Sequence, residues 1–95
     1  MEEYQRLAMS TKVYDKKWSL FYPALALSGE VGELNNKIKK VIRDNAELDK
    51  EEVVLELGDI LWYVAAIADD LEIGLEEVAR KNIEKLRKRQ ENGNH

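Results

Sequence analysis

Two pairs of carboxylates lie inside the two most apolar stretches of this 95-residue chain. The first pair is Glu30 and Glu33, and the second is Glu56 and Asp59. Residues three apart share one face of a helix, so each pair directs two negative side chains the same way. Burying unpaired carboxylates is costly, so these groups need a positive partner. The spacing therefore predicts a divalent-cation site held between two helices.

The residue types also indicate which ion would bind. The chain has no cysteine, and its single histidine is the terminal His95. Carboxylates without nitrogen or sulfur ligands favour Mg²⁺ or Mn²⁺ over zinc or iron. The alternative is that these are solvated carboxylates in helix salt bridges, such as Glu33 with Lys37. Two pairs, each bracketing a glycine (Gly32 and Gly58) on consecutive helices, favour the metal site.

Apolar residues recur with helical spacing along the whole chain. Pro23 suits the first turn of a helix, and Asp49 with Glu52 three residues later is typical of a helix start. Gly74 separates the last two helices. Four helices are therefore expected, over about 2–14, from Pro23 to 43–45, from the Asp49 cap to about 71, and from 75 to about 90. The tail 92–95 is expected to be frayed.

The third expected helix is apolar on nearly all sides, because Leu55, Trp62, Ala65 and Ala66 lie outside its main apolar stripe. Such a helix is buried on more than one side. Four helices of this length cannot provide that cover alone, so packing against another subunit is expected. One edge of the same helix stays polar, and its members are Glu52, Glu56, Asp59, Tyr63 and Asp70.

Composition narrows the class of protein. Hydrophobic residues make up 44% and charged residues 36%, which indicates one folded helical domain over residues 1–95. The net charge of −4 argues against nucleic-acid binding as the main role. The longest nearly uncharged run, Ile60–Ala68, is much shorter than the ~20 residues of a bilayer span, and the N-terminus lacks a signal-peptide pattern. A cytoplasmic protein that binds neither nucleic acid nor membrane is expected.

Several segments together resemble a known family. Ala26–Glu33 (ALSGEVGE) and Glu56–Tyr63 (ELGDILWY), with 22 residues between them, resemble the motifs of MazG-type all-α nucleoside triphosphate pyrophosphohydrolases. Asn82–Gln90 is similar to the final helix of that family, and Ser10–Tyr14 is similar to the lead-in of its small single-domain members. One departure is Gly29, which stands where many relatives have a first glutamate.

The resemblance implies a four-to-five-helix bundle completed by dimerisation, as a homodimer or homotetramer. It implies Mg²⁺-dependent hydrolysis of a nucleoside triphosphate, or its deoxy form, to the monophosphate and pyrophosphate, with a role in cleansing the nucleotide pool. The implied site residues fall into two groups. The metal-binding and catalytic carboxylates are Glu30, Glu33, Glu56 and Asp59, and the substrate-binding candidates are Lys40, Tyr63, Asn82 and Lys85.

Two alternatives stay open from the sequence. A related all-α pyrophosphohydrolase would act on dUTP, dCTP or phosphoribosyl-ATP. A non-catalytic helical dimer would use the acidic edge to bind a partner or to stay in solution. The general base is also open, with Glu52 as one neighbour able to orient a water, and so is the number of metal ions.

Overall fold

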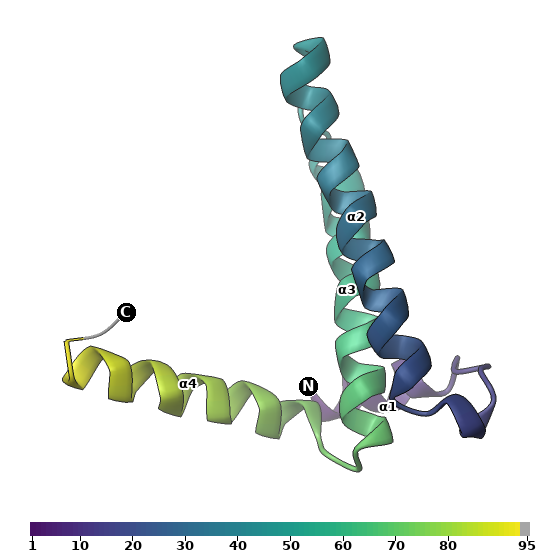
Figure 1. Cartoon of the computed structure of the whole chain (residues 1–95), viewed down its shortest axis with the longest axis vertical. Coiled ribbons are helices and arrows are strands. Elements are labelled where there is room, and N and C mark those ends of the chain that lie inside the picture. Colours follow the sequence, from purple (N-terminus) through teal and green to yellow (C-terminus); the bar gives the residue numbers. More distant parts are fainter. Residues whose placement is uncertain (94–95) are drawn as a thin grey trace.

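The computed structural model describes residues 1–93, and all regular elements in that range are helical. In chain order these are α1 (Glu2–Met9), a 3₁₀ turn η1 (Lys16–Trp18), α2 (Phe21–Asp44), α3 (Lys50–Asp70) and α4 (Leu75–Glu91). Helices α2 and α3 form a long antiparallel hairpin, α1 lies at the base of that hairpin, and α4 projects away from it (Figure 1). The all-α prediction is confirmed.

The first helix is shorter than predicted, because it ends at Met9 and not near Tyr14. The Thr11 hydroxyl donates to the Ala8 carbonyl oxygen at 2.7 Å, which closes the last turn. Beyond it, Tyr14 leaves the helical path and donates its hydroxyl proton to Asp70 on α3. A tertiary hydrogen bond thus overrides the helical pattern of this segment.

The other predicted helix boundaries agree closely with the structure. The Asp49 carboxylate accepts hydrogen bonds from the backbone N–H groups of Glu51 and Glu52, at 3.0 and 3.3 Å, as an N-cap does. Helix α2 ends at Asp44, and the next residue, Asn45, has the left-handed backbone conformation common at helix ends. Of the tail predicted to fray, residues 94–95 lie outside the described part of the chain.

The core is small and sits where α1 crosses the C-terminal half of α3. Ala65 and Ala66 have no exposed surface. The buried Gln5 amide joins three segments there, donating to the carbonyl oxygens of Ala65 and Ile73 and accepting from the Leu75 backbone N–H. This side chain therefore ties α1 to the end of α3 and to the start of α4.

This core changes which of the four residues outside the main apolar stripe of α3 can contact another subunit. Ala65 and Ala66 are already buried within one chain, where α1 packs on α3. Trp62 belongs to the same contact, because its indole N–H lies 3.1 Å from the Ala8 carbonyl oxygen and 2.9 Å from the Thr11 hydroxyl. Leu55, another residue of that set, is more than half exposed, as are its neighbours Val54 and Leu57, so the uncovered apolar surface of α3 lies in its N-terminal half.

A single chain is open and does not form a closed bundle. Its radius of gyration is 16.1 Å, whereas a compact chain of this length has about 12 Å. Its accessible surface is 7473 Å², against about 5,600 Å² for a typical folded monomer of this mass. The exposed apolar side chains are spread over all three long helices: Leu25 and Ile42 on α2, Val54, Leu55 and Leu57 on α3, and Val78, Ile83 and Leu86 on α4.

None of the described helices is long and apolar enough to cross a membrane.

Candidate metal centre

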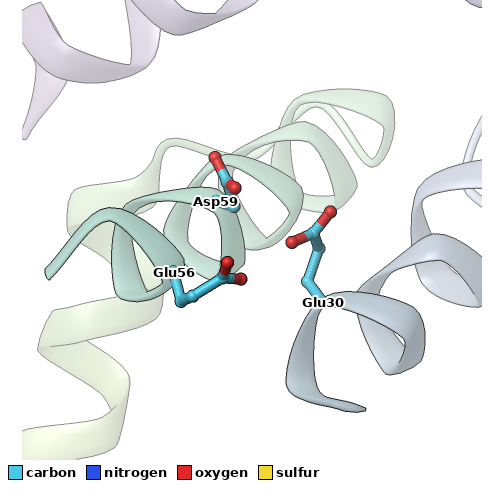
Figure 2. A group of neighbouring side chains, drawn as sticks. All are labelled: Glu30, Glu56 and Asp59. Carbon is cyan, nitrogen blue, oxygen red and sulfur yellow. The ribbon is translucent and has the colours of Figure 1, made fainter. Parts of the chain in front are cut away.

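Three carboxylates from two helices converge midway along the α2–α3 hairpin (Figure 2). Glu30 comes from α2, and Glu56 and Asp59 come from consecutive turns of α3. One oxygen of each carboxylate lies within 4.8 Å of an oxygen of the other two. The i, i+3 spacing directs Glu56 and Asp59 to the same side of α3, and the antiparallel packing brings Glu30 opposite them.

The Glu56 carboxylate is largely enclosed. Its side chain is 12% exposed, and its Oε1 lies 3.4 Å from the Lys37 ammonium. Its Oε2 is buried and has no hydrogen-bond partner among the described residues. A buried carboxylate oxygen without a partner is costly. A bound cation would supply the missing partner, so the oxygen-only donor set fits a hard divalent ion.

The electrostatics of Glu30 agree with this interpretation. Burial raises the pKa of the Glu30 carboxyl, and the negative charges of Asp59 and Glu56 raise it further. Glu33, one turn along α2, adds a smaller contribution in the same direction. Like charges held this close oppose ionisation. A cation between them would reverse that effect, which is what a metal-binding group requires.

Lys37 has a role that the sequence analysis did not assign. Its ammonium lies 3.4 Å from Glu56 and 3.9 Å from Glu52, both across the hairpin on α3. The alternative pair within α2, Glu33 with Lys37, is absent among the ion pairs of the described residues. The available signal was the spacing, because residue 37 lies seven positions after Glu30 and so on the same face of α2.

The structure separates two of the predicted residues on α2 from this centre. Glu33 is exposed and lies outside the group of three converging carboxylates. Lys40 is ten residues from Glu30, which is about 15 Å along a helix. It lines a different hollow of about 260 Å³ near the α2–α3 connection, together with Lys37 and Glu52.

Tyr63 lies beside the carboxylates, as its sequence position indicated. It lines an open hollow of about 300 Å³ with Glu30, Asp59 and Trp62. The two aromatic rings meet edge to face, with centroids 5.0 Å apart. Burial raises the pKa of the Tyr63 hydroxyl, and the neighbouring Tyr22 and Glu30 raise it further. The hollow therefore has an acidic side and an aromatic side.

Asn82 and Lys85 are not brought to this hollow within one chain. Both are exposed on α4, and α4 projects away from the α2–α3 hairpin (Figure 1).

Comparison with known proteins shows the family of this chain. The model of the MazG nucleotide pyrophosphohydrolase domain matches residues 23–94, which include every residue of the candidate centre. The chain belongs to the MazG nucleotide pyrophosphohydrolase family. It is also similar to the "Gene 37 protein" of Mycobacterium phage L5, with 36% identity over 100 residues that cover 95% of this chain and 88% of the relative. No solved structure matches the chain.

Membership confirms the resemblance drawn from ALSGEVGE and ELGDILWY. It indicates nucleotide pyrophosphohydrolase activity and a nucleotide substrate. Enzymes of the family typically depend on a divalent metal, and the carboxylates Glu30, Glu56 and Asp59 are the group in the described chain suited to hold one.

Proposed function

We propose that this MazG-family protein hydrolyses a nucleoside triphosphate, or its deoxy form, to the monophosphate and pyrophosphate with Mg²⁺ as the cofactor. Mn²⁺ is the expected substitute. The observation that carries the proposal is the buried Oε2 of Glu56, which has no hydrogen-bond partner among residues 1–93, in the carboxylate that converges with Glu30 and Asp59. Removal of noncanonical nucleotides from the cellular pool is the proposed role.

The carboxylates of the site have different proposed roles, according to their positions. Glu30, Glu56 and Asp59 would hold the ion, with Glu33 as a further candidate one turn from Glu30. Bound Mg²⁺ would neutralise charge on the triphosphate. A water adds to a phosphorus of the α–β bridge as the bridging P–O bond breaks, and its proton passes to a carboxylate or to solvent. Glu52, 3.9 Å from Lys37, is a candidate to orient that water.

The hollow beside the carboxylates suits the non-reacting part of a nucleotide. Trp62 and Tyr63 form its aromatic side, and Glu30 and Asp59 its acidic side. A triphosphate bound at the carboxylates would extend its sugar or base toward these rings. Aromatic rings stack on any base, so the aromatic side of the hollow by itself supports binding of several different nucleotides.

A second copy of the chain is proposed to complete the structure. The accessible surface exceeds that of a typical monomer of this mass by about 1,900 Å², and a stable dimer buries about 800 Å² or more per partner. On α4, at 100° per residue, Val78, Ile83 and Leu86 fall within an arc of about 140°. Asn82 lies inside this apolar arc and Lys85 at its edge, so whatever covers α4 contacts both.

This arrangement supports a homodimer, or a homotetramer built from it, in which Asn82 and Lys85 approach the phosphates bound by another copy. Lys85→Ala should then lower kcat/KM by about tenfold or more, while leaving the melting temperature nearly unchanged, since an exposed helix lysine contributes little stability. The matched control is Lys81→Ala on the same helix. Unchanged kinetics for Lys85→Ala would exclude the phosphate contact.

The direct test is pyrophosphate release from a panel of ribo- and deoxyribonucleoside triphosphates, with and without Mg²⁺. The panel includes dUTP, dCTP and phosphoribosyl-ATP, so that preference for one of these would identify the related pyrophosphohydrolase activity. Glu56→Gln serves as the inactive control. Metal-dependent release that this variant abolishes supports the proposal. If no nucleotide is hydrolysed, the non-catalytic helical dimer becomes the better interpretation.

A further inference from the structure

Asp70 ends α3 with a carboxylate that is almost completely enclosed, its side chain being 4% exposed. It accepts three hydrogen bonds from the segment that precedes α2: from the Lys12 ammonium at 2.8 Å, the Tyr14 hydroxyl at 2.7 Å and the Leu20 backbone N–H at 2.8 Å. Burial by itself would raise the pKa of Asp70, but these donors, the Leu20 N–H first, hold it below its ordinary value. These hydrogen bonds hold residues 12–20 against the end of α3, and we call this segment the strap.

The backbone at Leu20 shows what this strap holds in place. Leu20 has φ 70° and ψ −51°, and the Phe21 N–H donates to the Ser19 carbonyl oxygen at 2.8 Å. This is a γ-turn in a rarely populated form that strains a leucine. Helix α2 begins at the next residue. Because Asp70 accepts the Leu20 N–H, it stabilises the turn that sets the starting point of α2.

A continuous series of contacts then leads from Asp70 to the hollow. The ring of Tyr14, held by Asp70, lies against the ring of Tyr22 with centroids 5.2 Å apart. Tyr22 in turn neighbours the Tyr63 hydroxyl and, after burial, is the next largest cause of its raised pKa. Tyr63 lines the hollow beside Glu30. Residues 12–20 are thus linked, through Tyr14 and Tyr22, to the aromatic side of the hollow.

Distances along α3 show that Asp70 acts indirectly. Asp70 is seven residues from Tyr63 and eleven from Asp59, which is about 10 and 16 Å along the helix. Its carboxylate is also almost completely enclosed and already accepts three hydrogen bonds, so a substrate does not reach it. We infer that Asp70 is a positioning residue, which anchors residues 12–20 so that Tyr22 stays against Tyr63 and shapes the aromatic side of the hollow. This inference rests on the proposed function, in which that hollow receives a nucleotide.

The test is steady-state hydrolysis by Asp70→Asn. This change removes the charge that holds Lys12 and replaces the carboxylate oxygen shared by the Tyr14 hydroxyl and the Leu20 N–H with a weaker, neutral acceptor. Because the aromatic side contacts the non-reacting part of the substrate, KM should rise about three- to tenfold while kcat stays within about twofold. The affinity of the carboxylates for Mn²⁺ should not change. A general loss of folding would instead lower the active fraction, and so kcat, without this selective rise in KM.

Asp69→Asn is the matched control. Asp69 also binds Lys12, at 2.7 Å, but it contacts neither Tyr14 nor the Leu20 N–H, so its substitution should leave KM unchanged. If Asp69→Asn raises KM as much as Asp70→Asn does, or if Asp70→Asn leaves KM unchanged, the inference is wrong. Should Asp70→Asn fail to fold, Tyr14→Phe decides the matter, with KM expected to rise about two- to threefold and an unchanged KM overturning the inference.

The anchoring role of Asp70 can also be tested if the proposed function is wrong. If the parent protein hydrolyses no nucleotide, hydrogen exchange at the Leu20 amide and near-ultraviolet circular dichroism of the tyrosines still test the strap. Faster exchange and an altered tyrosine signal in Asp70→Asn, but not in Asp69→Asn, support the anchoring role. Equal behaviour of the two variants overturns it.

Discussion

Lys37 on α2 reaches across the helical hairpin to Glu56 on α3, with 3.4 Å between Nζ and Oε1. The other oxygen of the same carboxylate, Oε2, is buried and has no hydrogen-bond partner in the described part of the chain, and Glu30 and Asp59 converge with this carboxylate. One oxygen of Glu56 is thus paired with a cation of the protein, and the other could bind a metal ion. A metal bound there would share this carboxylate with Lys37, so each would affect how the other binds.

This relationship predicts the effect of removing the lysine charge. Lys37→Met should lower the stability of the metal-free protein by at most about 1 kcal/mol, because Lys37 is about a third exposed and solvent screens the pair. It should tighten Mg²⁺ binding, since a neighbouring positive charge no longer repels the ion. Thermal unfolding with and without Mg²⁺ measures both effects. Lys39→Met, at an exposed position of α2, is the control, and weaker Mg²⁺ binding in Lys37→Met would contradict the prediction.

Neutralising a carboxylate of the centre should have different effects on folding stability and on hydrolysis. In the metal-free protein, Asp59→Asn relieves repulsion among the converging carboxylates, so this variant should be as stable as the parent or more stable. Glu56→Gln gains the same relief but loses the ion pair with Lys37. Hydrolysis should be abolished in both. Mg²⁺ should raise the melting temperature of the parent by the linkage of about RT ln(1 + [L]/Kd) and raise that of the variants less.

Ca²⁺ extends the same experiment. Its looser coordination should reproduce the stabilisation without supporting turnover. Glu84→Gln, on the exposed face of α4, controls for the loss of one negative charge. If Asp59→Asn retains full activity, or if it unfolds the metal-free protein as loss of a structural ion pair would, the metal centre is wrongly assigned.

The fourth predicted carboxylate can be tested against the other three. Glu33 is exposed and lies outside the converging group, whereas Glu30 is half-buried within it. Glu30→Gln should therefore weaken Mg²⁺ binding by about tenfold or more, the effect of losing a direct ligand, and Glu33→Gln by much less. Isothermal titration with Mn²⁺ measures both. Equal losses would show that Glu33 moves to the ion when it binds.

The Asp70 strap predicts a specific pH dependence of stability. The pKa of Asp70 is lowered in the folded protein, so its contribution is complete above the unfolded pKa of about 3.9 and is lost as pH falls through the folded value. The stability difference between the parent and Asp70→Asn should therefore be largest near neutral pH and shrink below about pH 4. Urea unfolding across this range measures it, and Asp69→Asn should show a smaller difference.

Tyr14, in the same cluster, predicts a second pH dependence of stability, at alkaline pH. Burial, followed by the hydrogen bond to Asp70, raises the pKa of Tyr14 to about 12. A tyrosine with a raised pKa stabilises the fold fully below its unfolded value of about 10, and the contribution is lost as pH rises toward 12. Stability of the parent relative to Tyr14→Phe should fall over that interval. A constant difference would mean that the Tyr14 hydroxyl is not held by Asp70.

The open shape of one chain predicts self-association. Sedimentation equilibrium at micromolar concentration should show at least a dimer of the 11.0 kDa chain. Ile83→Glu, in the apolar arc of α4 where the side chain is 48% exposed, should weaken the assembly without unfolding the chain. The control is Val13→Glu, at a position 95% exposed and outside the long helices. A clean monomer for the parent would remove the support for a site completed by another copy.

The amino-acid sequence by itself determined the helical class, the Asp49 cap, the end of α2 and the two carboxylate pairs. These features depend on contacts within a few residues, which spacing and local propensity describe well. The motifs around Glu30 and Asp59 were enough for the family resemblance that the comparison confirmed.

Only the tertiary structure decided which groups meet across helices. It brought Glu30 to Glu56 and Asp59 while leaving Glu33 outside, and it directed Lys37 to the opposite helix. Helical periodicity places a residue on a face but does not say which neighbour covers that face. For the same reason, periodicity did not show that α1 buries Ala65 and Ala66 on α3. The early end of α1 likewise follows from Asp70, whose hydrogen bonds to residues 12–20 join positions 50 or more residues apart.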